Sequence, residues 1–187
     1  MPLDVNTAHS AIVKAVGAGK LPLPRLDEAA RRVVTMMIWQ GRTKAQHPPA
    51  APGSGESVSA KVSARAVTVL SGRCRGPHVA GRVRLAGGTA GDRARFTAAA
   101  REVGITLGAG PLVTLIGYRG VPAGGDIAVA LDAPWPLARS AAPTKIALYG
   151  RTPAAFRALV AVLAGKAAAT GKLPAAVGNY RPGSGCR

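Results

Sequence analysis

The chain has 187 residues, of which 48% are hydrophobic, and 25 Lys and Arg against 8 Asp and Glu give it a formal net charge of +17. This length fits one domain, or one domain with an appendage, and the apolar content excludes a chain that is disordered throughout. No apolar stretch approaches the ~20 residues that a membrane span needs, and the chain starts without a basic and apolar leader. We therefore expect it in the cytoplasm if it is expressed as written.

The positive charge is scattered and is densest between residues 73 and 101. This segment carries seven arginines and one acidic residue, Asp92: Arg73, Arg75, Arg82, Arg84, Arg93, Arg95 and Arg101. Such a field attracts any polyanion, whether nucleic acid, an acidic envelope polymer or an anionic membrane surface. Because Phe96 is the one aromatic residue among these cations, the pattern favours a solvated arginine-rich surface over a nucleic-acid interface.

Residues 1–42 are expected to form two helices. In the first, capping residues precede an apolar stripe that ends at Gly17 and Gly19: Asn6, Thr7, Ala8, Ile12 and Val16. The second begins near Leu26, has Asp27 and Glu28 in its first turn, and carries the stripe Leu26, Ala30, Val33 and Met37. Two such helices cannot bury both stripes on each other, so a partner surface is missing from this segment.

Residues 43–60 are rich in Pro and Gly and are expected to be a linker, and residues 61–187 are expected to form the C-terminal domain. Two helices are predicted there, at 92–103 and 153–164. Short runs of Val, Ile and Leu predict strands at 66–70, 82–86, 112–116, 127–131 and 145–148. This alternation indicates a small doubly wound α/β sandwich with a mainly parallel sheet that is covered on both faces.

No residue of the chain is nominated as catalytic, cofactor-binding or metal-binding. Glycoside hydrolysis needs two acidic groups about 5–9.5 Å apart, whereas Asp126 and Asp132 flank one strand, about 20 Å apart. His9, His47 and His78 have no second ligand at metal spacing. The turn at 87–92 could hold an anion at a helix start, but it matches no phosphate-binding pattern and reads better as a plain βα turn.

Cys74 and Cys186 are the two cysteines of the chain. A reducing compartment would leave them as free thiols, and an oxidising one could join them and tie the C-terminal tail to the domain. Closing a loop of this size would contribute about 4–5 kcal/mol in the chain-entropy model. The sequence leaves both states open.

Several segments resemble family 3 glycoside hydrolases. Met1-Pro2, followed by Asn6-Thr7, and the stretches 18–22 and 25–34 resemble the end of the barrel, where a strand ending in Met-Pro precedes a helix that starts Arg-Leu-Asp. Residues 66–70 resemble the first strand of that family's C-terminal α/β domain. Residues 147–153, 162–165 and 171–174 resemble the last strand of that domain, the helix that follows it and the segment in which the chain leaves the domain. The resemblance covers nearly the whole chain outside the linker. It extends in particular to the envelope β-N-acetylhexosaminidases of actinobacteria, in which this second domain is reduced.

The resemblance implies a retaining β-N-acetylglucosaminidase that acts on muropeptides during cell-wall turnover in the cell envelope. Its nucleophile, an Asp, and its acid/base pair, a His and an Asp, would lie on barrel loops that precede the Met-Pro strand end. These residues would therefore lie upstream of Met1, and none is assigned to this chain. We expect residues 1–42 to be the remnant of a TIM-type barrel end, and the chain to be a scaffold, inactive alone, that meets an amino sugar only through a barrel domain or fragment.

A second reading is a stand-alone basic α/β module that binds an anionic polymer. The apolar stripes of the first two helices distinguish the two readings, since a self-sufficient module should not expose a large apolar face. Neither reading requires a cofactor.

Overall fold

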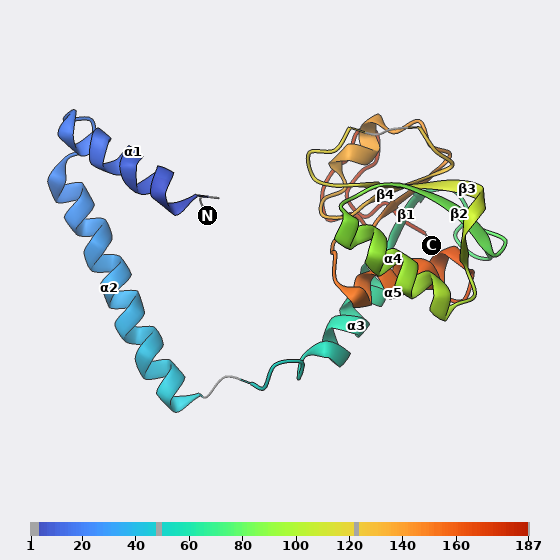
Figure 1. Ribbon diagram of the computed structural model, residues 1–187, viewed down its shortest axis with the longest axis horizontal. Helices are drawn as coiled ribbons and strands as arrows, with labels where there is room; N and C mark the ends of the chain where they lie inside the picture. Colours follow the sequence, from blue (N-terminus) through green and yellow to red (C-terminus); the bar gives the residue numbers. More distant parts are fainter. Residues whose placement is uncertain (1–3, 48–49, 122–123, 187) are drawn as a thin grey trace. The chain divides into compact units, whose positions relative to one another are not determined.

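The computed structural model describes residues 4–47, 50–121 and 124–186. The chain divides into two compact units, Met1–Pro52 and Gly53–Arg187, and each is described by itself. The first unit is helical, and the second contains the sheet (Figure 1).

The first unit contains α1 (Val5–Gly17) and α2 (Leu23–Gln46). The predicted capping role of Asn6 and Thr7 is wrong: Asp4 is the N-cap, and its side chain accepts hydrogen bonds from the backbone N–H groups of both residues. The predicted start of the second helix near Leu26 is also wrong. The helix includes Pro24, which is tolerated in the first turn, so the acidic pair that follows Leu26 lies beyond that turn.

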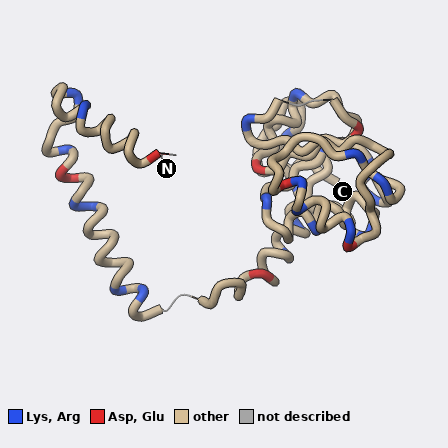
Figure 2. The backbone as a smooth tube through the Cα atoms, viewed as in Figure 1, with Lys and Arg blue, Asp and Glu red and all other residues tan. Residues whose placement is uncertain are grey.

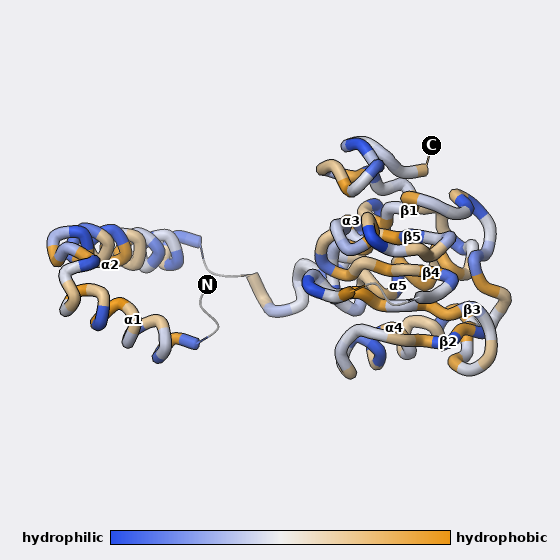
Figure 3. Tube along the Cα trace, turned by 90° about the horizontal axis from the view of Figure 1, so that it is seen from above, coloured by the Kyte–Doolittle hydropathy of each residue, from blue (hydrophilic) through white to orange (hydrophobic). Residues whose placement is uncertain are grey.

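No residue of α1 or α2 is buried. In the middle of α2, six large apolar side chains are exposed within seven positions: Val33, Val34, Met36, Met37, Ile38 and Trp39. Figure 3 shows the hydropathy of the chain along α1 and α2. At ~100° per residue these side chains point to all sides of the helix. A stretch that is apolar on every side is typical of a helix segment that another surface covers.

The second unit is built on a five-stranded sheet in the order β1-β5-β4-β3-β2, in which β2, β3, β4 and β5 are parallel and β1 is antiparallel to β5. The mainly parallel sheet predicted from the sequence is confirmed. The strands are β1 (Thr68–Ser71), β2 (Arg82–Gly87), β3 (Thr106–Ile116), β4 (Ile127–Ala130) and β5 (Thr144–Ala147).

Two α-helices of this unit, α4 and α5, cover one face of the sheet (Figure 1). α4 (Ala90–Glu102) buries Phe96, and α5 (Pro153–Leu163) buries Phe156, in one core with the side chains of the strands. The other face is covered by the 3₁₀ helix η1 (Trp135–Arg139) and by the C-terminal segment, through Leu137, Leu173 and Val177. Both faces are covered, as predicted, but the second carries irregular chain in which prolines disfavour an α-helix.

Helices extend into the segment 43–60 from both sides. α2 continues to Gln46, and a further helix, α3 (Glu56–Ala66), begins before residue 61 and packs against α5. Few apolar residues mark α3, so its pattern is weak, and its contact with α5 stabilises it instead.

Lys and Arg are spread over both units (Figure 2). Acidic side chains are few, and in the second unit Asp92 and Asp132 come together on a single arginine, Arg151. None of the helices in the described part of the chain is long and apolar enough to cross a membrane.

Candidate functional site

The parallel strands end at one edge of the sheet, and three charged side chains meet there. Asp92 lies in the first turn of α4, which follows β2; Asp132 follows β4; and Arg151 follows β5. Ligands of open α/β sheets bind outside the carboxyl ends of the strands. We call these three residues the carboxyl-edge cluster.

Asp92 is held by the start of its own helix. Thr89 is the N-cap, and its backbone N–H and its hydroxyl each donate to Asp92 Oδ2 at 2.8 Å, while the Asp92 N–H donates to Thr89 Oγ1 at 3.2 Å. This reciprocal capping box satisfies two backbone donors that the helix would otherwise leave unpaired. The Asp92 side chain is only 1% exposed, so its negative charge needs a cationic partner.

Arg151 is that partner, and it binds two carboxylates at once. Its Nη1 lies 2.7 Å from Asp92 Oδ2, and its Nε and Nη2 each lie 2.6 Å from one oxygen of Asp132. The backbone N–H of Tyr118 also donates to Asp132 at 3.1 Å. One guanidinium therefore ties the segments after β3, β4 and β5 to the start of α4.

This pairing decides which chemistry the cluster can perform. The hydrogen bonds that Arg151 donates to Asp132 hold the pKa of that carboxyl below its usual value, and the same bonds raise the pKa of Arg151. A general acid at neutral pH needs the opposite shift, a raised carboxyl pKa. Asp132 is therefore unsuited to act as a general acid, and its ion pair with Arg151 fixes this edge of the sheet.

A groove of about 300 Å³ opens beside the cluster. It is lined by Gly87–Thr89, by residues 114–117 and by Arg151. Gly87 has φ +70°, and a Cβ there would collide with the carbonyl oxygen of Leu115, so only glycine fits this close approach of two strands. The lining offers backbone groups and small side chains, which suit a polar ligand that lies close to the main chain.

Two exposed aromatic side chains lie at the same edge. Tyr118 and Trp135 pack edge to face with ring centroids 6.2 Å apart, and they are 61% and 52% exposed. Tyr118 is placed by its hydrogen bond to Asp132, and Trp135 begins η1 just after that residue. Exposed aromatic rings with a polar tip are typical of binding surfaces, and their apolar faces can stack on sugar rings.

The backbone between β5 and Arg151 is strained. Tyr149 has φ +60°, the one non-glycine residue with positive φ in the described part of the chain. This conformation costs about 1–2 kcal/mol for an L-residue. Tyr149 packs against the core on the η1 face of the sheet, which holds the turn that places Arg151 in the cluster.

The other residues considered from the sequence do not converge. Asp126 and Asp132 lie at opposite ends of β4, as the spacing predicted. No group of three His, Cys, Asp or Glu that could hold a metal occurs in the described ranges. The turn at 87–92 contains the capping box and forms part of the small groove. The sequence did not reveal this groove, because Arg151, which binds Asp92 and also lines the groove, lies 59 residues away from Asp92 in the chain.

No family model matches the chain, and no curated protein matches it. Solved structures do. A β-glucoside phosphorylase, BglX, aligns with 92% of this chain and 42% of its own at 15% identity and a TM-score of 0.55. A fungal multi-domain family 3 β-N-acetylglucosaminidase aligns with 91% of this chain and 25% of its own, at 15% identity and a TM-score of 0.54. A family 3 β-N-acetylglucosaminidase of a Paenibacillus species aligns with 87% of this chain and 41% of its own, at 16% identity and a TM-score of 0.51.

The chain has the fold of the C-terminal part of family 3 glycoside hydrolases. The expected α/β class and its likeness to this family are confirmed at the level of the fold. The chain spans between a quarter and about two fifths of the length of these neighbours.

Proposed function

We propose that this chain is the C-terminal part of a family 3 β-N-acetylhexosaminidase, and that a barrel domain or fragment preceding it supplies the catalytic residues. The observation that carries the proposal is the pattern of coverage: the neighbours match 87–92% of this chain but no more than 42% of themselves. Two of the neighbours bear the name β-N-acetylglucosaminidase. The chain alone is then a scaffold without activity.

The exposed apolar run of α2 supports a missing partner. Six large apolar side chains point to all sides of one helix and none is buried. Exposed apolar surface favours association, because each Å² that another surface removes from water contributes about 25 cal/mol. A contiguous exposed apolar patch therefore indicates a surface that a partner covers. The rest of a barrel would supply that surface on several sides of the helix, as the all-round pattern requires.

The carboxyl edge of the sheet is this domain's share of the substrate site in our proposal. Tyr118 and Trp135 would stack on a sugar ring, and the groove beside Arg151 would hydrogen-bond its hydroxyl groups. The cluster would keep both elements in place, because Arg151 and Asp132 link the loops that carry them. The amino-sugar substrate, a muropeptide of the actinobacterial cell envelope, would reach the chemistry only through the barrel.

An envelope location is part of the proposal and has one structural support. The disulfide Cys74–Cys186 persists in oxidising compartments and is rare in the cytosol.

The test is an activity measurement with a chromogenic β-N-acetylglucosaminide. We expect no turnover by the chain alone, and turnover by a polypeptide in which the coding sequence upstream of Met1 is joined in frame. In the extended protein, Trp135→Ala should raise KM more than it lowers kcat. Leu107→Ala, which truncates an exposed apolar side chain near the start of β3, away from the carboxyl ends of the strands, is the control. Turnover by the chain alone, or none by the extended protein, contradicts the proposal.

A further inference from the structure

The opposite edge of the sheet, where the parallel strands begin, carries a groove of about 800 Å³. Its walls are the loop from Gly72 to Arg82, the segment 109–111 of β3, and the start of β5 at Pro143 and Thr144. We call it the amino-edge groove. It lies at the other end of the strands from the carboxyl-edge cluster, so it is separate from the site described above.

Cationic side chains line the groove, and the neighbouring carboxylate of Asp126, which accepts a hydrogen bond from the Leu112 N–H at 2.7 Å, is not among its lining residues. Arg73, His78 and Arg82 line it, and no lining residue is acidic. No Asp or Glu side chain of the described residues pairs with Arg73 or Arg82, in contrast to Arg151, which binds two carboxylates. Arg75 and Arg84 are exposed close by in the sequence, and Arg84 donates from Nε to the carbonyl oxygen of Gly110.

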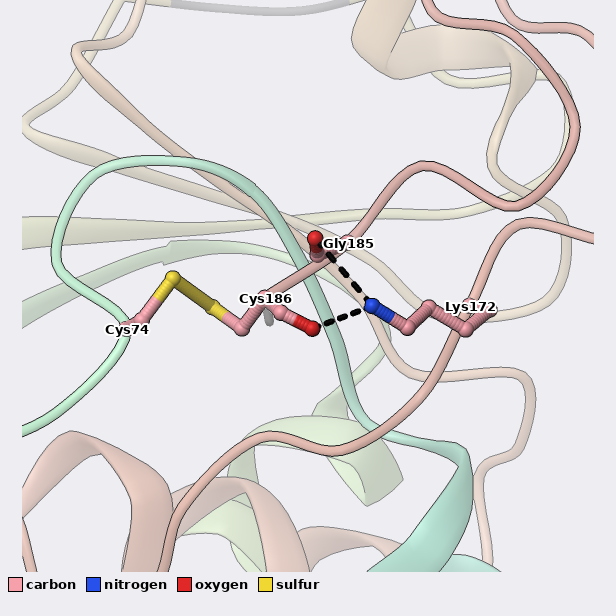
Figure 4. Close-up of a disulfide and its surroundings, with 4 residues drawn as sticks. All are labelled: Cys74, Lys172, Gly185 and Cys186. Carbon is pink, nitrogen blue, oxygen red and sulfur yellow. Dashed lines mark hydrogen bonds between the residues drawn. A yellow bond between two sulfur atoms is a disulfide. The ribbon is translucent and has the colours of Figure 1, made fainter.

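The loop that carries these cations is fixed at both ends. Cys74, between two of the arginines, is bonded to Cys186, with Cα atoms 5.4 Å apart. Lys172 in turn donates to the carbonyl oxygens of Gly185 and Cys186 (Figure 4). Further along the loop, the backbone N–H groups of residues 78 and 79 donate to the carbonyl oxygen of Leu163, at 2.8 and 3.3 Å. A groove held in this way loses little conformational entropy when it binds a ligand.

The remaining lining restricts the ligand further. Besides Arg73, His78 and Arg82, the groove has apolar walls that include Pro77, Val79, Pro111 and Pro143, and no lining residue is Phe, Tyr or Trp. Single-stranded nucleic acids bind through stacking of bases on aromatic rings, which this lining does not offer. Arg73 and Arg82 line the groove from different segments of the chain. A planar carboxylate is satisfied by the paired N–H groups of a single arginine, whereas a tetrahedral phosphate accepts hydrogen bonds from several directions. Two separate guanidinium groups therefore suit a phosphate better than a carboxylate.

We propose that the amino-edge groove binds the phosphodiester groups of a non-aromatic chain, a polyol-phosphate or sugar-phosphate polymer, through Arg73 and Arg82. The disulfide holds the loop in the binding conformation, so binding is strongest in the oxidised protein. The low pKa of His78, caused by its burial and then by the nearby charge of Arg73, keeps this side chain neutral near pH 7, where it can accept or donate a hydrogen bond at the groove.

The experiment measures binding of fluorescently labelled poly(glycerol phosphate) to the full chain by anisotropy, at low and moderate salt. Arg73→Ala/Arg82→Ala should weaken binding at least about tenfold, since two charge-assisted contacts are lost. The matched control, Arg101→Ala/Arg181→Ala, removes the same charge from exposed positions outside the groove and should change affinity less than about threefold. Circular dichroism verifies that all variants are folded.

Polygalacturonate and an oligothymidylate are compared as the carboxylate and nucleic-acid alternatives. We expect both to bind at least about tenfold more weakly than poly(glycerol phosphate), and Cys74→Ser/Cys186→Ser to weaken binding of the phosphate polymer. Equal losses in the groove variant and its control would show that net charge alone drives binding and would overturn the proposal. Tighter binding of polygalacturonate or the oligothymidylate would overturn the assignment of the ligand, and unchanged binding of the serine variant would overturn the role of the disulfide.

Discussion

Arg151 and Asp132 form a two-pronged ion pair, in which Nε and Nη2 of the arginine each lie 2.6 Å from a different carboxylate oxygen. The pair is about one third exposed on both sides, but the third nitrogen of the same guanidinium enters the protein and binds the buried Asp92. The arginine thus connects a surface contact to a buried charge. Its removal would leave that buried charge without its closest cation.

We expect Arg151→Met to destabilise the second unit by about 2–4 kcal/mol, because the buried carboxylate of Asp92 loses its closest cation and keeps only the longer contact, 3.8 Å, with Arg95. Urea unfolding followed by circular dichroism measures this change. Adding Asp92→Asn should restore part of the stability, since the amide carries no charge. Arg157→Ala, which breaks exposed pairs with Glu56 and Glu102, is the control and should cost less than about 1 kcal/mol. Equal losses from both arginine variants would contradict a buried role for Arg151.

The ion pair also predicts a pH dependence. Because Arg151 lowers the pKa of Asp132 in the folded state, the stabilisation is fully present above the unfolded pKa of about 3.9 and is lost as pH falls through the lower folded pKa. The difference in unfolding free energy between the wild type and Asp132→Asn should therefore be large at pH 6 and shrink below pH ~4. Unfolding midpoints at several pH values measure it, with Glu102→Gln as the exposed control. A difference that stays constant down to the most acidic pH would refute this assignment.

The disulfide should stabilise the second unit strongly. It closes a loop with a sequence separation of 112 residues, which corresponds to about 4–5 kcal/mol in the chain-entropy model. Under oxidising conditions, Cys74→Ser/Cys186→Ser should lower the free energy of unfolding, measured by urea unfolding, by this amount. The wild type in reducing agent should unfold like the variant. A wild type that is insensitive to reducing agent would show that the tail is held by other contacts.

The apolar run of α2 should make the chain associate. Val33→Lys/Met37→Lys should reduce self-association, because it places two charges within the exposed run, and should leave the unfolding of the second unit unchanged. Size-exclusion chromatography with light scattering measures the change. Thr43→Lys/Gln46→Lys adds the same charge in the last turn of the helix, outside the run, and should leave association as it is. A monomeric wild type would remove the physical argument for a missing partner.

Much of the second unit follows from local patterns. Runs of Val, Ile and Leu predicted all five strands to within a few residues, although β3 starts at Thr106 rather than 112 because its first part pairs with β2 before an irregularity in the register. Thr152 followed by Pro153 predicted the start of α5, since a capping hydroxyl and a fixed φ are local properties. α3 escaped prediction because it is stabilised by its contact with α5 and has little amphipathic pattern of its own.

The sequence by itself determined the α/β class, the order of the strands and of the helices α4 and α5 in the second unit, the apolar excess of the first two helices and the likeness to family 3 glycoside hydrolases. Only the tertiary structure decided which distant residues meet. Arg151 joins Asp92 and Asp132, Cys74 joins Cys186, and Arg73 shares a groove with Arg82. The reason is physical: helices and strands follow from periodic local patterns, whereas ion pairs, disulfides and grooves depend on how the sheet aligns strand ends that are far apart in the chain.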